Sequence, residues 1–72
     1  MTQTNEPKTR LTPREKEIYK LIVDDNSTTA IAEKLSVSYE TIKSHRRNIY
    51  RKLRVKSLIE LMNLHHKIKK VH

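Results

Sequence analysis

The chain has 72 residues, no cysteine and no glycine, and a formal net charge of +8 at pH 7. This length fits one small domain with a thin core, and the lack of cysteine excludes disulfides and thiolate-bound metals as its supports. The excess of positive charge favours an anionic partner, with nucleic acid first and an acidic membrane surface second. The apolar residues are mainly Leu, Ile and Val, which is typical of a compact helical bundle.

The start of the chain is polar and shows no helical periodicity. Residues 1–10, MTQTNEPKTR, are expected to form a flexible tail or linker, and residues 11–70 a single domain. The tail lacks the apolar segment of a signal peptide, and no apolar run approaches the roughly 18 residues that a membrane span needs. These features predict a cytoplasmic protein, or a cytoplasmic piece of a longer one, with no membrane partner.

Start and stop signals predict the first two helices. Thr12 and Glu15 form a capping-box pattern that opens a helix over residues 13–24. The run Asp-Asp-Asn-Ser at residues 24–27 ends it, because Asp and Asn tolerate left-handed backbone and can turn a chain without glycine. A shorter helix is predicted over residues 28–35, with Ser27 or Thr28 as its cap, so the two helices are joined by a tight turn.

The third predicted helix, residues 39–54, is amphipathic. Ser38 is placed to cap it, and Val37, in the turn before it, is expected to point into the core. Its apolar residues are spaced seven and four apart, which places them on one side of a helix. They are Ile42, Ile49 and Leu53.

The opposite face of this helix is predicted to be strongly basic. Residues 41–57 contain seven Lys or Arg and no Asp or Glu. Lys52 lies at the edge of the face and is expected to be only solvated. Tyr50, which flanks the face, fits simple packing better than stacking or hydrogen bonding at a phosphate. A short turn followed by a helix that is basic on its outer side indicates a helix-turn-helix for the major groove of DNA.

The fourth predicted helix, residues 58–69, is apolar around more than half of its circumference. Ser57 is placed to cap it. A helix that packs on a single core needs an apolar stripe of about 100°, so the excess predicts a second contact. The simplest such contact is the same helix of another subunit, and the tail or a missing domain is the alternative. The residues assigned to this contact are Ile59, Leu64 and Ile68.

The most distinctive stretches of the chain are LTPREKEIYKLI and IAEKLSVSYETIKSHRRNIYRKL, followed by Val-Lys-Ser and Glu-Leu. They closely resemble the LuxR-type DNA-binding domain, also called the GerE or FixJ/NarL type, of bacterial transcription regulators. The resemblance covers residues 11–69. It implies an all-α fold of four helices whose middle pair is the helix-turn-helix. It also implies double-stranded DNA as partner, a homodimer through the fourth helix, and a receiver or sensor domain ahead of this one in a longer parent chain.

The resemblance assigns roles to residues at matching positions. Base contacts fall to Lys43, Ser44 and Arg47, which also face outward on the predicted helix; Lys43 or Arg47 suits the O6 and N7 acceptors of guanine. Three of the residues assigned to phosphates keep an alternative role. Tyr39, like Tyr50, fits simple packing better. Arg46 fits a structural role equally well, and His45 fits a packed neutral histidine better. The full phosphate-contacting set is Thr28, Thr29, Tyr39, Thr41, His45, Arg46, Arg51, Lys56 and Ser57.

The chain departs from the family pattern at three places. Asp25 stands where the turn after the first helix usually has glycine, Thr29-Ala30 stands for Lys-Glu, and Leu58 stands for Arg. These changes affect the shape of a turn, one phosphate contact and the apolar surface of the fourth helix. No base-contacting position is lost.

Two other functions stay open from the sequence. A sigma-factor-like promoter-recognition module shares the helix-turn-helix, and a basic helical module for an acidic protein or membrane surface shares the charge. Enzyme chemistry has little support, because the chain has no nucleophile-base pair and no glycine-rich phosphate loop. His65, His66 and His72 have no cysteine or clustered carboxylate beside them, so neither a metal nor another cofactor is predicted. The sequence does not identify the operator or the controlling signal.

Overall fold

The computed structural model describes residues 10–70 of the chain, and side chains up to residue 67. The described part is all-α, as predicted, and every helix boundary falls within one residue of its expected place. The predicted tail lies, except for Arg10, outside the described residues. The four helices are α1 (Pro13–Val23), α2 (Thr28–Leu35), α3 (Tyr39–Leu53) and α4 (Leu58–Lys70).

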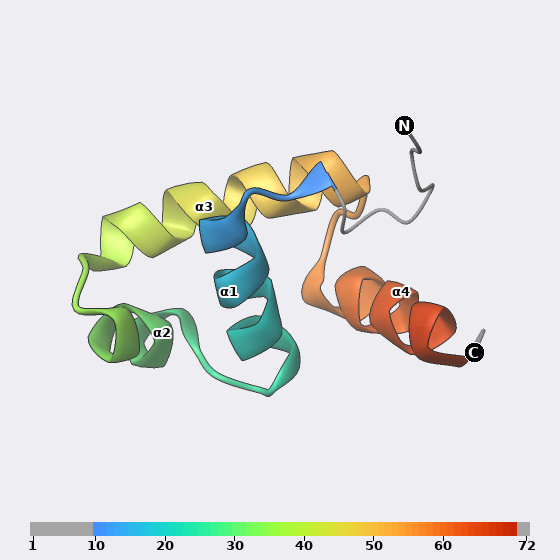
Figure 1. The fold of residues 1–72 in the computed structure, drawn as a ribbon, viewed down its shortest axis with the longest axis horizontal. Helices are drawn as coiled ribbons and strands as arrows, with labels where there is room; N and C mark the ends of the chain where they lie inside the picture. Colours follow the sequence, from blue (N-terminus) through green and yellow to red (C-terminus); the bar gives the residue numbers. More distant parts are fainter. Residues whose placement is uncertain (1–9, 71–72) are drawn as a thin grey trace.

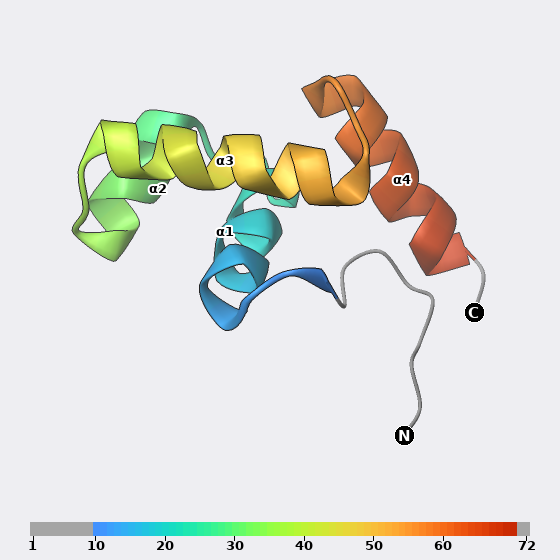
Figure 2. The same cartoon turned by 90° about the horizontal axis from the view of Figure 1, so that it is seen from above.

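The longest α-helix, α3, has 15 residues and lies across α1 and α2. Figures 1 and 2 show this crossing from two sides. The turn between α2 and α3 is short, so these two helices form the predicted helix-turn-helix. The remaining helix, α4, lies near the C-terminal end of α3, far from α2 (Figure 1). This arrangement leaves one long side of α3 uncovered by the other helices.

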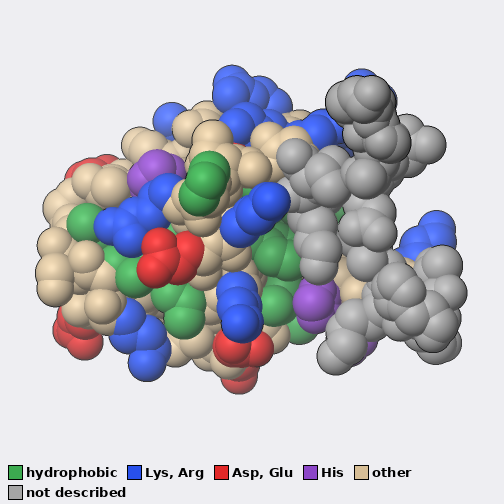
Figure 3. Space-filling model, in the orientation of Figure 1, with side chains coloured by type: hydrophobic (Ala, Val, Ile, Leu, Met, Phe, Trp, Pro, Cys, Tyr) green, Lys and Arg blue, Asp and Glu red, His purple; other side chains and the backbone are tan. Residues whose placement is uncertain are grey.

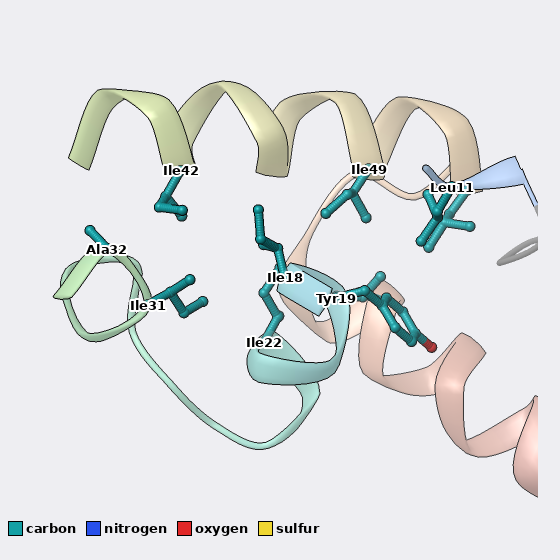
Figure 4. Packing of buried hydrophobic residues seen from close by; sticks show 10 residues of the cluster. Leu11, Ile18, Tyr19, Ile22, Ile31, Ala32, Ile42 and Ile49 are labelled. Carbon is teal, nitrogen blue, oxygen red and sulfur yellow. The ribbon is translucent and has the colours of Figure 1, made fainter. Parts of the chain in front are cut away.

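One apolar core holds the first three helices together. Figure 4 shows side chains from α1, α2 and α3 pointing toward one another between the helices. Ile18, Ile31, Ile42 and Ile49 are fully buried, and Ile22 is 2% exposed. Burying a side chain of this size contributes about 1.5–3 kcal/mol relative to leaving it in water. The same cluster therefore stabilises the domain and holds α3 from behind.

The last helix, α4, joins this core through one of its sides. Leu61 is fully buried, and Leu64 is half-buried against the core. The Tyr19 hydroxyl of α1 lies 2.9 Å from Nδ1 of His65, and the two rings meet edge to face. Burial raises the pKa of the Tyr19 phenol above its ordinary value, because the charged form is disfavoured away from water. A buried leucine and a polar contact thus fix the position of α4 against α1.

The predicted caps are confirmed. Thr12 Oγ1 accepts a hydrogen bond from the amide of Glu15 at 3.1 Å, and Glu15 Oε1 accepts one from the amide of Thr12 at 3.0 Å. Ser27 caps α2 and Ser38 caps α3, each through its side-chain oxygen. Ser57 accepts a hydrogen bond from the first turn of α4 at 3.2 Å. Each cap satisfies a backbone donor that the helix itself leaves unpaired.

The first three helices end in the same way although the chain has no glycine. Asp25, Ser36 and Arg54 adopt left-handed backbone, with φ of 72°, 58° and 59°. In each case the amide of the following residue donates to the carbonyl five positions back, at 3.0–3.1 Å. This is the Schellman arrangement, which glycine usually supplies. The apolar residue after two of these ends, Val37 or Val55, packs against the core, as predicted for Val37.

Candidate nucleic-acid interface

The uncovered side of α3 carries a strip of long side chains at a spacing of four residues, which places them one above another along the helix. This α3 strip consists of Tyr39, Lys43, Arg47 and Arg51, all of which are exposed. Lys43 Nζ lies 6.0 Å from the ring centroid of Tyr39, and Arg51 donates to Asn48 Oδ1 at 3.2 Å. Figure 3 shows Lys and Arg side chains gathered along the edge of the molecule where α3 lies. The strip is therefore a cationic surface on a rigid element.

The three residues predicted to contact bases lie on this side of α3. Lys43, Ser44 and Arg47 are all exposed. The two ion pairs found among the described side chains involve none of them. Their donors therefore face solvent without a carboxylate from this part of the chain. Arg and Lys donors of this kind match the paired acceptors on the major-groove edge of guanine.

The residues predicted to contact phosphates lie within the α3 strip and around it, at the start of α2, along α3 and just before α4. Both helix starts carry the partial positive charge that favours phosphate. Six members of the set are exposed, namely Thr29, Tyr39, Thr41, Arg51, Lys56 and Ser57. The half-buried members are Thr28, His45 and Arg46.

Two groups at the start of α4 are already engaged inside the domain. The amide of Lys56 donates to Glu60 Oε1 at 2.8 Å, and the Ser57 hydroxyl accepts from the amide of Glu60 at 3.2 Å. The Lys56 amide is therefore hydrogen-bonded within the domain, whereas the predicted contact of Lys56 with a phosphate stays a prediction. The groups that remain suited to an anion are the Lys56 ammonium and the hydroxyl proton of Ser57.

Arg46, for which the sequence left two roles open, is held within the domain. Its Nη1 donates to Thr28 Oγ1 at 2.9 Å, and its Nη2 donates to the Tyr50 hydroxyl at 2.7 Å. The guanidinium carbon lies 5.6 Å from the ring centroid of Tyr50. These contacts connect the start of α2 to α3, so Arg46 has a structural role. Its contact with phosphate stays a prediction.

The expectation that Lys52 is only solvated is wrong. Its Nζ lies 2.8 Å from Glu15 Oε1, and the two side chains are 30% and 6% exposed. Burial disfavours the charged form of Glu15, but hydrogen bonds from Lys52 and Thr12 and the charge of Lys52 outweigh it. The pKa of Glu15 therefore lies below its ordinary value. This contact joins the start of α1 to the end of α3 and fixes how α3 crosses the domain.

The residues predicted to form a dimer contact differ in their surroundings. Ile59 is 72% exposed, and its neighbour Leu58 is 45% exposed. Leu64 packs against the core of its own chain, which leaves only part of it for a partner. The side chain of Ile68 lies outside the described residues. Ile59 and Leu58 therefore form the exposed apolar part of α4 among the described side chains.

Two further findings concern the part of the chain that the structure describes. It contains no cluster of three or more His, Cys, Asp or Glu side chains that could hold a metal ion. None of its helices is long and apolar enough to cross a membrane.

The fold and the α3 strip together define a helix-turn-helix domain of the DNA-binding class. Two helices meet at a tight turn, and the second presents a cationic side while the core holds its other side. Residues 9–65 match the family described as "Bacterial regulatory proteins, luxR family". The chain belongs to this family, as its sequence motifs predict, and is a LuxR-type helix-turn-helix DNA-binding domain of the kind found in transcription regulators.

Individual relatives support the same assignment. The spore germination protein GerE of Bacillus subtilis (strain 168) is 38% identical over 58 residues, a match that covers 75% of this chain and 78% of that protein. An HTH-type transcriptional regulator of Aeromonas salmonicida, described as putative, is 44% identical over 55 residues. That match covers 76% of this chain but only 28% of the regulator. The chain therefore spans about four fifths of one relative and a little over a quarter of the other.

A solved structure of the response regulator RcsB in complex with DNA is also similar to this one. The TM-score is 0.74 and the sequence identity is 37%, over 79% of this chain and 28% of the RcsB chain. Likeness at this level of identity confirms the four-helix fold.

Two departures from the family pattern are visible in the structure. Asp25, where the family has glycine, keeps the left-handed conformation that glycine adopts readily. The turn therefore has the left-handed backbone that glycine would supply, although aspartate adopts this conformation less readily. Leu58, where the family has Arg, is exposed and adds apolar surface to the start of α4.

Proposed function

We propose that α3 enters the major groove of double-stranded DNA and reads a specific base sequence on behalf of a transcription regulator. The observation that carries this proposal is the α3 strip, a run of exposed side chains whose charges share one sign. The major groove is about 12 Å wide and admits an α-helix. Lys43, Ser44 and Arg47 contact bases, and Lys43 or Arg47 donates to the O6 and N7 acceptors of guanine.

Phosphate contacts supply most of the affinity and none of the base discrimination. They come from the start of α2, from α3 on both sides of the base-contacting residues, and from the segment before α4. Each phosphate that the protein neutralises steepens the fall of log K with log salt by about 0.9. The residues proposed for these contacts are Thr28, Thr29, Tyr39, Thr41, His45, Arg46, Arg51, Lys56 and Ser57.

Two copies of the protein bind two half-sites and meet through α4. The exposed side chains of Leu58 and Ile59 support this arrangement, because an apolar pair on the surface of a basic domain favours burial against a partner. Half-sites about 10 bp apart, one turn of DNA, suit such a pair. The longer relatives also support a receiver or sensor domain ahead of this one that controls the dimer in the cytoplasm.

The test of base reading is selection of bound sites from random duplexes, followed by titration of the selected duplex and of single-base variants. Lys43→Ala and Arg47→Ala are expected to reduce discrimination by about 1–3 kcal/mol at one base pair each, whereas Arg51→Ala weakens all duplexes alike. Lys20→Ala is the matched control, because Lys20 is exposed near the end of α1 that points away from α3 in Figure 1.

Unchanged base preference in both Lys43→Ala and Arg47→Ala would refute the assignment of base contacts. Vesicles of anionic lipid provide a separate test of the whole proposal. Equal affinity for such vesicles and for every duplex, with no selected sequence, would favour a general basic surface over a DNA reader.

A further inference from the structure

The contacts of Arg46 leave its charge and half of its terminal donors unused. The hydrogen bonds to Thr28 and Tyr50 take one N–H from each terminal nitrogen, and each nitrogen carries a second. Both acceptors are neutral hydroxyls. Neither ion pair among the described side chains includes Arg46. The guanidinium is therefore fixed in direction but is not neutralised by a carboxylate from this part of the chain.

The two hydroxyls around Arg46 act as donors toward any third group. Because each accepts a hydrogen bond from the guanidinium, its own proton must point elsewhere. Thr28 is also the first residue of α2, where the helix dipole places partial positive charge. Thr28, Arg46 and Tyr50 thus bring together cationic and hydroxyl donors from two helices. The chemistry of this cluster suits an oxygen of a phosphodiester.

We propose that Tyr50 is a positioning residue for DNA binding, whose hydroxyl holds the Arg46 guanidinium in place to meet a backbone phosphate. The inference rests on the proposed function and adds a residue that it leaves without a role. A free arginine side chain samples many rotamers and loses that freedom when it binds. The contacts with Tyr50 and Thr28 fix the side chain before DNA arrives, which lowers the entropic cost of the phosphate contact.

The geometry separates the hydroxyl of Tyr50 from its ring. Tyr50 lies four residues after Arg46, one turn along the same side of α3. The ring lies 5.6 Å from the guanidinium carbon, and the hydroxyl accepts the 2.7 Å hydrogen bond. A Tyr50→Phe variant keeps the ring and its packing but loses the hydrogen bond. It therefore tests positioning without removing a charge or opening a cavity.

The experiment uses the full 72-residue chain and a duplex of mixed sequence, one half-site long, because phosphate contacts do not depend on sequence. Affinity is measured between about 50 and 200 mM salt, where the slope of log K against log salt counts phosphate contacts. Tyr50→Phe is expected to bind about threefold to tenfold more weakly, within the net range of one ordinary hydrogen bond. It is also expected to show a shallower slope, by up to about 0.9.

A double-mutant cycle identifies the residue through which Tyr50 acts. In an Arg46→Ala background, Tyr50→Phe is expected to cause no further loss of affinity. If Arg46→Ala does not fold, Arg46→Lys provides the background, since lysine keeps the charge but lacks the planar pair of donors. Tyr19→Phe is the matched control, because it removes a tyrosine hydroxyl contact of 2.9 Å between α1 and α4. Its affinity for a half-site is expected to stay at the wild-type value.

Three results would overturn the inference. They are wild-type affinity in Tyr50→Phe, an equal loss in both backgrounds, and an unchanged salt slope alongside weaker binding. Failure of the wild-type chain to bind any duplex would instead refute the proposed function.

Discussion

Two ion pairs of almost equal length allow the effect of burial on stability to be measured within one small domain. Arg14 and Glu17 lie 2.9 Å apart with side chains 42% and 50% exposed. Lys52 and Glu15 lie 2.8 Å apart with side chains 30% and 6% exposed. If the distance between the charged atoms determined how much an ion pair stabilises the fold, the two pairs would contribute equally to the free energy of unfolding. If burial decides it, only the second should affect the free energy of unfolding.

The perturbation is Lys52→Met, which keeps the aliphatic part of the side chain and removes the charge. Removing one partner of a fully buried pair costs about 3–5 kcal/mol. The cost should be smaller here, because Lys52 reaches water and Glu15 keeps its hydrogen bond from the amide of Thr12. A loss of about 1–2 kcal/mol follows, which lowers the Tm by about 4–16 °C in a domain of this size. Arg14→Met should cost about 0–0.5 kcal/mol, since exposed pairs contribute little.

The assay is thermal and urea unfolding followed by circular dichroism at 222 nm. A cycle of Lys52→Met, Glu15→Gln and the double variant isolates the coupling between the two side chains. The reasoning is refuted if Lys52→Met and Arg14→Met lower the Tm equally, or if Lys52→Met leaves it unchanged. Because this pair fixes the crossing of α3 over α1, Lys52→Met should also weaken duplex binding at temperatures well below its Tm.

Three further predictions concern a turn, a titration and a surface. Asp25→Gly should raise the free energy of unfolding by about 0.5–1 kcal/mol, because glycine adopts left-handed backbone more readily; a lower urea midpoint would contradict this. The pKa of Glu15 is depressed on folding, so its contribution to stability is present above the unfolded-state pKa and is lost as the pH falls through the folded-state pKa. The stability gap between wild type and Glu15→Gln should therefore shrink in acid, and a gap that is constant from neutral pH into acid would count against the assignment. Ile59→Asp should leave stability within about 0.5 kcal/mol, since Ile59 is 72% exposed in the first turn of α4. It should weaken binding to a two-site duplex more than to a half-site, and equal weakening of both would argue against a dimer through α4.

Local signals in the sequence were enough to place the helices and to find the exposed side of α3. The caps at Thr12, Ser27 and Ser38 involve residues three positions apart, so they can be recognised before any tertiary contact is known. Spacings of four and seven likewise determine which residues share a side of a helix. Ile42 and Ile49 were therefore predicted to be buried and are so. The outward direction of Lys43 and Arg47 follows from the same periodicity.

Contacts between distant residues were decided by the tertiary structure alone. Lys52 and Glu15 are 37 residues apart, Arg46 and Thr28 are 18 apart, and Tyr19 and His65 are 46 apart. A helical wheel treats each helix separately, so it contains no information on which charged or hydroxyl group arrives from another helix. For this reason the sequence predicts that Lys52 is solvated, whereas the structure pairs it with Glu15.

In α4, too, the sequence determined one property and the tertiary structure another. Its sequence determined that α4 has more apolar surface than one core needs. Only the packing of α4 against the core decided that Leu61 is buried, that Leu64 is partly buried against that core, and that Ile59 is left in water. The amount of apolar surface is a property of composition, whereas the side that becomes buried depends on how the helix is rotated against its neighbours.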